Sequence, residues 1–491
     1  MSAASSPALP RARSGGEPAR RALTLVGQHP AFVAVLGVGL VVRVLVMVAY
    51  PPALFFGDSW GYLVSAFGGH PVALSNIHPD GYPLLLRLLT LPDRDMAQIT
   101  AVQHLVGLAV GTIVYVVLVR VRIPRTAAAA AAALVLLDGY AIALEQYVMS
   151  DTFFTLAVLL AVLLVARPAL LGADGRAGWR AAAGAGLLVA ASVLLRSAGL
   201  FVAPLILVYL LWTRAGWRPL AAFVVALAVP LLAYCAAEDA RFHTFGFSQT
   251  SGWLSYGRVA GFADCSGVHV APGSRPLCET AAQRHAHPDA PDWYIFSPAS
   301  PAVKLFGGYA GTVAAQRRSN AALGTFARRI VEHQPLDYLD AVARDVLRYF
   351  TPGATPYDDA VSATALPKAA SAEEVVAVVH ERYLPHAHLR VQSPASVVRA
   401  YRRVIHVPRP VLALLVLASL AALALRVPAR REVLLLSGTG VALILGTALS
   451  AGFGVRYLMP AVPLVAIGGT LAARDLWARE QARRRRPATA Q

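Results

Sequence analysis

Carboxylates and a histidine stand beside apolar stretches in the first third of the chain, where they could accept a proton or hold a hydroxylated substrate. Asp58 lies in FFGDSWGYL, directly after the first apolar run, and Asp151 opens another run in VMSDTFFTL. His78 and Asp80 lie between them in NIHPDGYPLLL, and Glu145 stands near the end of the preceding run. Ionisable groups at membrane depth are costly, so these residues are functional candidates by default.

Two arginines lie near the ends of apolar runs, Arg196 in LLRSAGL and Arg456 in GVRYLMPAVPL. Fixed cations next to carboxylates suit a substrate that has an anionic head group and a hydroxyl to be activated. Each residue alone also has a structural explanation. Asp151 could favour the positive end of a helix dipole, and Arg43 and Arg87 are expected to snorkel toward water.

The composition predicts that membrane helices position these residues. Of the 491 residues, 57% are hydrophobic and only 14% are charged, whereas a soluble domain has roughly 25% charged residues. The net charge of +17 could indicate a nucleic-acid partner. The arginines, however, cluster between apolar runs, where the positive-inside rule puts them. We therefore expect a lipid bilayer and no nucleic acid as the environment of the chain.

Apolar runs of about membrane length recur from end to end. They cover approximately residues 31–50, 97–119, 127–146, 152–167, 181–196, 198–212, 219–237, 408–425, 432–450 and 457–473. The stretch GYPLLLRLLTL at 81–91 is too short to span and is predicted to lie in the interface. The sequence thus predicts an all-α polytopic membrane protein. It has about ten transmembrane helices, interfacial helices in the first outer loop and one large extracytoplasmic loop.

Arginine clusters give the expected orientation, because all of them fall on one side of a ten-span topology. The clusters are Arg11, Arg13, Arg20 and Arg21; Arg120, Arg122 and Arg125; Arg167, Arg176 and Arg180; Arg214 and Arg218; Arg426, Arg430 and Arg431; and Arg483, Arg484, Arg485 and Arg486. Both termini are therefore expected in the cytoplasm of a multi-pass cell-membrane protein, with the first run as a signal anchor. The acids and the two arginines introduced above then share the extracytoplasmic face.

The runs and loops divide the chain into segments. These are a disordered cytoplasmic N-terminus at 1–30, an N-terminal module of about seven helices at 31–237 with a first outer loop at 51–96, an extracytoplasmic loop or subdomain at 238–407, a C-terminal module of three helices at 408–473, and a basic cytoplasmic tail at 474–491.

The cysteines bear on the compartment. Cys265 and Cys278 lie in the polar segment that is expected outside the cell, where an oxidising environment favours a disulfide between them. A zinc site with His285 and His287 is the alternative, although the spacing matches no common zinc pattern. We expect the disulfide and no metal site.

At these residues the chain resembles the GT-C superfamily of polytopic glycosyltransferases, which use polyprenyl-phosphate sugars. Within that superfamily it is most similar to the protein O-mannosyltransferases and the aminoarabinose transferases of lipid A. The matching motifs are GDSWGYL, HPDGYPLLL, SDTFFTLAVLL, LLRSAGL and RYLMPAVPLVAI. In the middle loop, GWLSYGRVAGFADC resembles actinobacterial members.

The resemblance implies an inverting transfer of a sugar from a polyprenyl-phosphate carrier to an acceptor hydroxyl. Asp58 would take the hydroxyl proton and Asp151 would orient the acceptor or the sugar. Cationic side chains would stabilise the leaving phosphate, above all Arg196 and Arg456. The implied substrate-binding residues are His78, Asp80, Tyr82, Glu145, Arg196, Arg258, Lys304, Arg456 and Tyr457. A divalent cation stays open as a cofactor.

Two other classes of function remain open. A transporter or flippase for a lipid-linked saccharide would also need arginines at the outer face, but it should show internal repeats, and the sequence shows none. A polymerase or ligase of surface polysaccharides would likewise have many spans and a large outer loop. The acceptor could be a protein, a lipid or a cell-wall glycan.

Overall fold

The computed structural model describes residues 27–67, 77–89, 95–172, 176–288, 290–308, 312–353, 364–368 and 389–485. Within these residues the chain is helical, with an isolated bridge between Leu54 and Tyr147 and no strand. The predicted arginine cluster before residue 27 and Arg486 lie outside the described residues.

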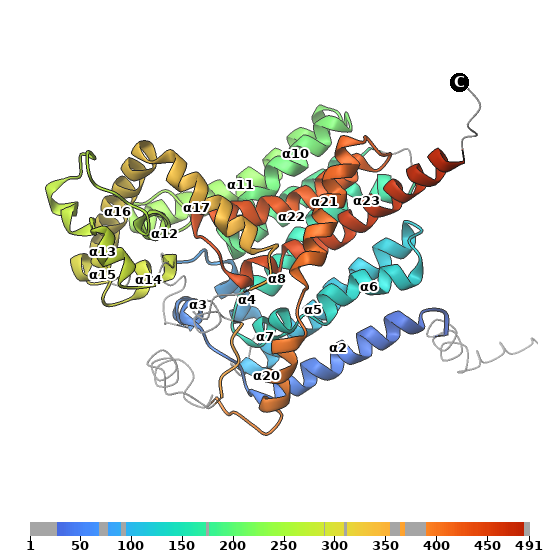
Figure 1. Cartoon of the computed structure of the whole chain (residues 1–491), viewed down its shortest axis with the longest axis horizontal. Coiled ribbons are helices and arrows are strands. Elements are labelled where there is room, and N and C mark those ends of the chain that lie inside the picture. Colours follow the sequence, from blue (N-terminus) through green and yellow to red (C-terminus); the bar gives the residue numbers. More distant parts are fainter. Residues whose placement is uncertain are drawn as a thin grey trace, which may run out of the picture.

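The helices of the bundle coincide with all the apolar runs predicted from the sequence (Figure 1). They are α2 (Pro30–Ala49), α5 (Met96–Arg120), α6 (Arg125–Leu136), α7 (Gly139–Gln146), α8 (Asp151–Leu170), α9 (Trp179–Leu195), η1 (Ser197–Val202), α10 (Ala203–Trp212), α11 (Trp217–Phe242), α21 (Arg409–Ala424), α22 (Arg430–Ser450), η3 (Val455–Leu458) and α23 (Ala461–Arg484). The expected all-α membrane architecture is confirmed.

The number of helices that can cross a membrane by length and composition alone is five among the described residues, or up to seven if bent pairs count as one span. One bent pair is α6 with α7, at 44°, and the other is α20 (Ala395–Val404) with α21, at 41°. The remaining predicted runs form the shorter apolar helices α9 and η1–α10, and α23, which carries Arg474 and Asp475 in its second half.

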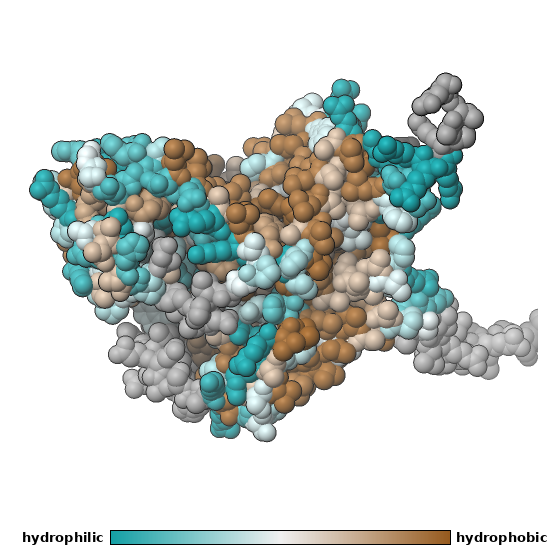
Figure 2. All heavy atoms as spheres, viewed as in Figure 1, coloured by the Kyte–Doolittle hydropathy of each residue, from teal (hydrophilic) through white to brown (hydrophobic). Residues whose placement is uncertain are grey.

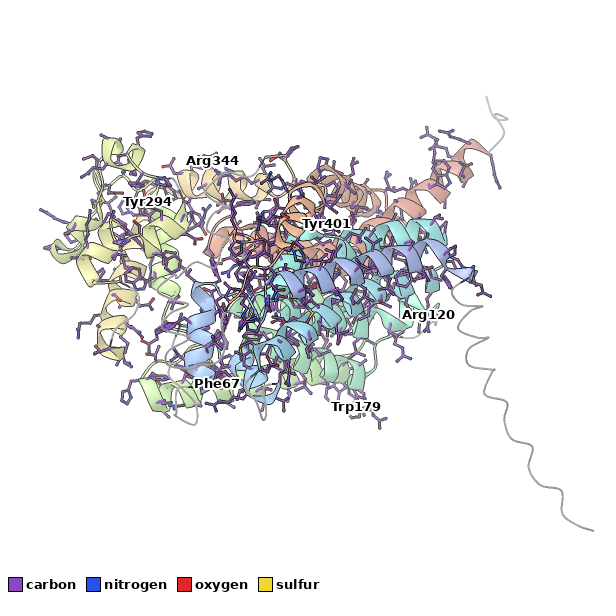
Figure 3. All side chains as sticks on the ribbon, turned by 90° about the horizontal axis from the view of Figure 1, so that it is seen from below. Phe67, Arg120, Trp179, Tyr294, Arg344 and Tyr401 are labelled. Carbon is purple, nitrogen blue, oxygen red and sulfur yellow. A yellow bond between two sulfur atoms is a disulfide. The ribbon has the colours of Figure 1, made fainter. Side chains whose placement is uncertain are left out.

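An apolar surface covers the bundle and ends in hydrophilic surface on both sides (Figure 2). Arg120 and Trp179 lie toward the end of the bundle opposite to Tyr294 (Figure 3). At the end of the bundle that carries Arg120, Arg474 donates a hydrogen bond to the Val121 carbonyl at 2.8 Å. The second half of α23 therefore meets the α5–α6 turn. The arginine-rich turns thus gather at one end of the bundle.

The other end of the bundle carries a separate helical subdomain with its own apolar core. Its helices are α12 (Ser251–Ala260), η2 (Pro272–Leu277), α13 (Ala281–His285), α14 (Pro291–Phe296), α15 (Pro301–Phe306), α16 (Val313–His333) and α17 (Pro335–Arg348). A disulfide joins Cys265 to Cys278. The later part of the segment predicted as one outer loop returns to the bundle, since Gln392 N donates to Ala49 O at 2.9 Å and α20 packs on α2.

A buried ion pair fixes the middle of the bundle. Arg43 on α2 donates from Nε and Nη2 to both carboxylate oxygens of Glu145 on α7, at 2.7 and 2.8 Å, and His104 on α5 lies 2.8 Å from the same carboxylate. The side chains of Arg43 and Glu145 are each only 1% exposed. The expectation that Arg43 snorkels is therefore wrong, because its charge is neutralised inside the bundle.

Close packing around this pair depends on a small residue. A Cβ atom at Gly107 on α5 would lie 2.0 Å from Glu145 Oε1, so a larger side chain there would displace the carboxylate.

Arg87 is also held by protein groups, since its guanidinium donates to the carbonyl oxygens of Ala66 and Ser65 at the end of α3 (Gly57–Phe67). Because Arg87 is only partly buried, these contacts do not contradict its predicted snorkelling, which stays a prediction.

The buried pair can be tested with Glu145→Gln, which keeps the shape of the side chain and leaves Arg43 without its counter-ion. Removing one partner of a buried ion pair costs about 3–5 kcal/mol. We expect a lower Tm for the purified variant in detergent. The double variant Arg43→Leu with Glu145→Leu should lose less stability than the single variants Arg43→Leu and Glu145→Leu lose together. Strictly additive losses of stability would contradict a direct pairing.

Candidate active site at the subdomain end of the bundle

A first ion pair brings together residues from the two ends of the chain. Arg456 in η3 donates from Nη1 to Asp58 Oδ2 at 2.6 Å, and His78 Nε2 lies 3.7 Å from Asp58 Oδ1. The N-terminus of α3 is held in place by Ser59, whose hydroxyl accepts from Phe56 N and donates to the Val148 carbonyl at 2.9 Å. The fold therefore presents Asp58 at the junction between α3, the α7–α8 connection and η3.

A second ion pair lies beside the first. Arg196, at the end of α9, donates to Asp151 at the start of α8. Both arginines lie near the Tyr457 ring, with Arg196 Cζ 5.2 Å and Arg456 Cζ 5.1 Å from its centroid. Contacts of this kind attract a guanidinium to an aromatic face. We call Asp58, His78, Asp151, Arg196, Arg456 and Tyr457 the Asp58 group.

Two tyrosines support the Asp58 group. The Tyr62 ring contacts the His78 ring at 4.8 Å and the Tyr82 ring at 4.9 Å, and the Tyr62 hydroxyl lies 3.1 Å from Ser150 Oγ. Tyr82 donates to Gln103 at 2.8 Å. Sequence analysis did not assign Tyr62 and Ser150 to the site. In the sequence, only their positions near Asp58 and Asp151 pointed to the site. Such positions do not distinguish a residue of the site from a residue that merely packs beside it.

The charges of the group follow from its surroundings. Burial disfavours the Asp58 carboxylate, but Arg456 and His78 outweigh it and lower the pKa of Asp58 to about 2. Burial lowers the pKa of His78, aided by Arg456 and Arg196 and opposed by Asp58. At neutral pH Asp58 is therefore an ionised carboxylate beside Arg456, and His78 is a neutral imidazole that can donate or accept a hydrogen bond.

The remaining predicted residues lie elsewhere. Glu145 belongs to the bundle core, and Arg258 and Lys304 belong to the subdomain. Arg258 pairs with Asp345 at 2.7 Å, and no contact among the described residues joins Lys304 to the Asp58 group. The structure thus brings together Asp58, His78, Asp151, Arg196, Arg456 and Tyr457, with Tyr82 behind them.

Asp80 forms a second buried acidic position next to α11. Asp80 is only 7% exposed, and its backbone N donates a hydrogen bond to Tyr234 Oη at 3.3 Å. Burial, and secondly the Glu238 carboxylate, raise the pKa of Asp80 to about 7 against the effects of Arg241 and Arg87. Asp80 therefore anchors the HPDG segment to α11, and no hydrogen bond among the described residues joins its side chain to the Asp58 group.

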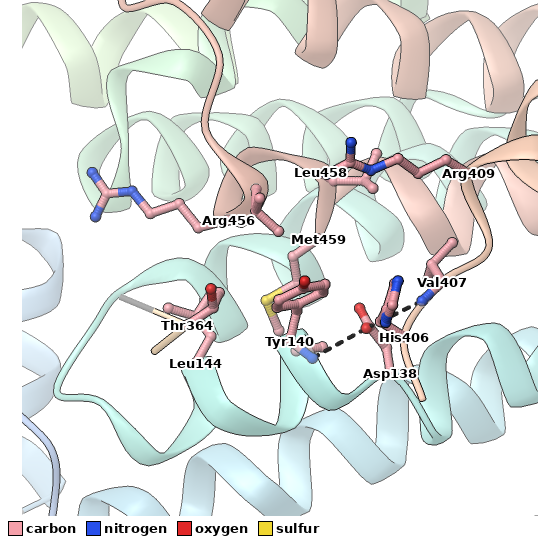
Figure 4. Close-up of a pocket in the computed structure, with 12 residues that line it drawn as sticks. Asp138, Tyr140, Leu144, Thr364, His406, Val407, Arg409, Arg456, Leu458 and Met459 are labelled. Carbon is pink, nitrogen blue, oxygen red and sulfur yellow. Dashed lines mark hydrogen bonds between the residues drawn. The ribbon is translucent and has the colours of Figure 1, made fainter. Parts of the chain in front are cut away.

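A small cavity of about 20 Å³ separates α7 from η3 (Figure 4). Asp138 lines it and accepts hydrogen bonds from Tyr140 N at 3.2 Å and Val407 N at 3.4 Å, so its carboxylate caps α7. The Arg456 guanidinium points away from Asp138. Arg456 thus lines the cavity, but its guanidinium pairs with Asp58 and not with Asp138. Among the described residues, no group of three or more His, Cys, Asp or Glu side chains lies close enough to hold a metal ion.

Comparison with known families gives a match over the middle of the N-terminal module. Residues 90–245 match the family of dolichyl-phosphate-mannose-protein mannosyltransferases. The match covers roughly a third of the chain and includes Asp151 and Arg196. The resemblance expected from the sequence motifs is confirmed over these residues. No curated protein sequence gives a significant match.

Solved structures give only distant likenesses. The chain is similar to the Archaeoglobus fulgidus oligosaccharyltransferase in its apo form, with 14% identity and a TM-score of 0.40 over 94% of this chain and 52% of that one. It is also similar to ArnT from Cupriavidus metallidurans bound to undecaprenyl phosphate, with 18% identity and a TM-score of 0.36 over 91% and 78%. The chain spans about half the length of the oligosaccharyltransferase.

The raised pKa of Asp80 predicts a pH dependence of stability. Between about pH 4 and about pH 7 the folded protein keeps a proton that the unfolded chain releases, so stability should fall as the pH rises through this window. In Asp80→Asn this part of the Tm–pH profile should flatten. The exposed Asp340→Asn serves as the control, and an equal flattening in both variants would refute the assignment to Asp80.

Proposed function

We propose that the protein is an inverting membrane glycosyltransferase. It moves a sugar from a polyprenyl-phosphate carrier to an acceptor hydroxyl at the extracytoplasmic face. The observation that carries the proposal is the pair of carboxylate–arginine contacts, Asp58–Arg456 and Asp151–Arg196, joined across Tyr457. The family match over residues 90–245 supports it, because the name of that family contains dolichyl-phosphate mannose, which is a polyprenyl-phosphate sugar.

The two arginines suit the phosphate of such a donor. In the transfer, the bond between the anomeric carbon and the phosphate oxygen breaks, and the phosphate keeps the electron pair. Its growing negative charge is stabilised by fixed cations at short range. Arg456 and Arg196 both face the Tyr457 ring, so one phosphate group lying near that ring would meet two guanidinium groups.

Donor binding would also prepare the base. While Arg456 is bound to Asp58, the pKa of Asp58 stays at about 2 and its carboxylate is a weak proton acceptor. A phosphate that competes for Arg456 removes much of this stabilisation, so the pKa of Asp58 rises toward its ordinary value of about 3.9. Asp58 would then take the acceptor hydroxyl proton as the oxygen attacks the sugar from the face opposite to the phosphate.

His78 and Asp151 have supporting roles in this proposal. His78 lies 3.7 Å from Asp58 and its ring contacts the tilted Tyr62 ring, and in this place it could hydrogen-bond to the sugar or the phosphate. Asp151 would orient hydroxyls of the acceptor or the sugar once Arg196 turns to the phosphate. A transporter would need no base at this position, and a glycosyl-transfer assay with polyprenyl-phosphate sugars separates the two.

The orientation proposed here rests on charge. Arginine-rich turns gather at the end of the bundle away from the subdomain, which the positive-inside rule assigns to the cytoplasm. The subdomain and the Asp58 group would then face the extracytoplasmic side, where a Cys265–Cys278 disulfide is stable.

Asp58→Asn tests the base. The substitution nearly keeps the shape of the side chain and removes the proton acceptor, so turnover should fall by roughly 100- to 10,000-fold. Donor binding should not weaken, because Arg456 and Arg196 remain and the Asp58 carboxylate no longer competes with the phosphate for Arg456. Arg456→Ala should weaken donor binding as well as turnover. Both are measured with purified protein in a radiolabelled sugar-transfer assay and a donor titration.

The controls for this experiment are a folding measurement and a distant variant. Tm and elution profile should stay close to those of the wild type, and Asp340→Asn, an exposed residue of α17 that pairs with Arg344, should transfer normally. A well-folded Asp58→Asn protein with near-normal turnover would remove Asp58 from the mechanism and shift the role to Asp151.

Labelling of new cysteines tests the orientation. Ala299 is exposed in the subdomain and Pro428 is exposed in the α21–α22 turn at the opposite end. The native thiols interfere little, because Cys235 is buried and the other two are joined. Ala299→Cys should react with a membrane-impermeant reagent on intact cells, and Pro428→Cys only after lysis. The reverse pattern would place the site in the cytoplasm.

A further inference from the structure

A large cavity lies in the subdomain, where it meets the bundle. Its volume is about 610 Å³, within the range of about 300–1,000 Å³ that small-molecule sites occupy. Helices α12 and α16 form most of its wall, with Tyr338 of α17 and Leu449 of α22. The Asp58 group does not line it. The mechanism proposed above therefore does not use this cavity.

Arg258 is the buried charge in the cavity wall. The residue is 6% exposed, and its Nη1 donates to Asp345 at 2.7 Å. Its Nε and Nη2 have no hydrogen-bond partner among the described residues. These two nitrogens form one edge of the planar guanidinium, and such an edge matches both oxygens of a carboxylate or a phosphate. Leaving them unpaired is costly, so an anion that accepts both hydrogen bonds is favoured.

The rest of the wall indicates the kind of molecule that carries this anion. Ser251, Ser255 and Thr325 supply hydroxyls, and Asn320 supplies an amide. Such groups pair with the hydroxyls of a sugar. An extended peptide is usually bound by an open strand edge or by an apolar groove. The described part of this wall has no strand, and its helices mix these polar groups with the apolar side chains of Val259, Val331 and Leu449.

The other charges in the wall largely cancel. Arg328 and Glu332 both line the cavity from α16, with opposite signs and one helical turn apart. Arg258 is deeper than either, because it is buried while Arg328 and Glu332 are both exposed. The anion preference of the cavity is therefore decided by the free edge of Arg258.

The cavity lies close to the segment that carries Arg456. The Tyr338 hydroxyl donates to the Leu449 carbonyl at 2.8 Å, near the end of α22. Asp345, the partner of Arg258, approaches the next turn of chain, since its Oδ2 would be 3.5 Å from a Cβ atom at Gly452. Gly452 precedes η3 and Arg456 by a few residues, so one stretch of chain lines the cavity at Leu449 and contacts Asp58 at Arg456.

We propose that this cavity binds a saccharide unit that carries a carboxylate or a phosphate, with the anion on the Nε–Nη2 edge of Arg258. On the proposed function, this unit belongs to the acceptor, and the cavity holds it while the acceptor hydroxyl reaches Asp58. This assigns an anionic glycan as the acceptor class. The binding site itself does not depend on the transfer reaction.

Binding of simple probes to the purified full-length protein tests the proposal. The probes are glucuronate, glucose 6-phosphate and uncharged glucose, titrated by saturation-transfer NMR and by the ligand-induced rise in Tm. Glucuronate or glucose 6-phosphate should bind, and glucose should bind much more weakly. Which of the two anions binds better distinguishes a carboxylate from a phosphate ligand.

Two variants act on the cavity through different physical effects. Arg258→Lys keeps a positive charge for Asp345 but loses the two-nitrogen edge, so the Kd for the anionic sugar should rise by roughly 10- to 100-fold, as for one lost hydrogen bond to a charged group. Gly324→Leu fills the cavity, because an added Cβ there meets only Gly252 Cα, at an ordinary 3.5 Å. The matched control is Arg344→Lys, an exposed arginine of α17 that pairs with Asp340.

The outcomes separate the proposal from the proposed function, because no donor is needed for binding. Binding of the anionic sugar by the wild type and the control, with loss in both cavity variants, supports the site even in a protein that transfers nothing. No binding by the wild type, or unchanged binding in Gly324→Leu, would overturn the site and leave the transferase proposal intact. Capture of an acidic peptide in preference to the sugars would overturn the saccharide assignment.

Discussion

The requirement that buried charges be paired constrains this chain more than any other single interaction. A charge transferred from water into a low-dielectric interior pays a penalty of several kcal/mol unless a counter-ion and hydrogen bonds compensate it. Arg43 and Glu145 satisfy that requirement in the bundle core and thereby tie α2 to α7. The same requirement joins Asp58 to Arg456 and Asp151 to Arg196 at the subdomain end. The core and the candidate site are therefore assembled by one kind of contact.

Exposure distinguishes the structural pair from the candidate catalytic pair. The side chains of Arg43 and Glu145 are each 1% exposed, whereas those of Arg456 and Asp58 are 15% and 16% exposed. Water or a substrate phosphate can reach the second pair and exchange partners with it, but the first pair is enclosed by helices and by Gly107. Two pairs of the same chemical type thus differ in their access to solvent because of the space around them.

The sequence predicts the helices well, because each apolar run has the length and composition of its helix and needs no tertiary information. It also identifies Asp58, Asp151, Arg196 and Arg456 as residues of one face, since their positions in the topology follow from arginine-rich loops. Which carboxylate pairs with which arginine does not follow. Glu145 looks like Asp58 in the sequence, and only the packing of α2 against α7 places it opposite Arg43.

Arg258 shows the same limit within the subdomain. Its position in a motif similar to known transferases suggested a substrate contact, but its partner Asp345 lies on another helix, α17, and the cavity beside it arises from how α12 packs on α16. Lys304 lies on a short exposed helix end that the sequence alone could not separate from the site. Local sequence thus gives the residue types, and tertiary packing decides their neighbours.

The separation of Asp58 and Arg456 along the chain has a consequence for biosynthesis. The two residues are 398 positions apart, and Arg456 follows all but the last of the bundle helices. During insertion from the N-terminus, α3 emerges early with a carboxylate whose counter-ion has not yet been synthesised, while Asp151 and Arg196 already meet within one module. The nascent protein therefore holds only half of the Asp58–Arg456 pair until its final helices enter the membrane. On the proposed function, the growing chain would be inactive until its assembly is finished.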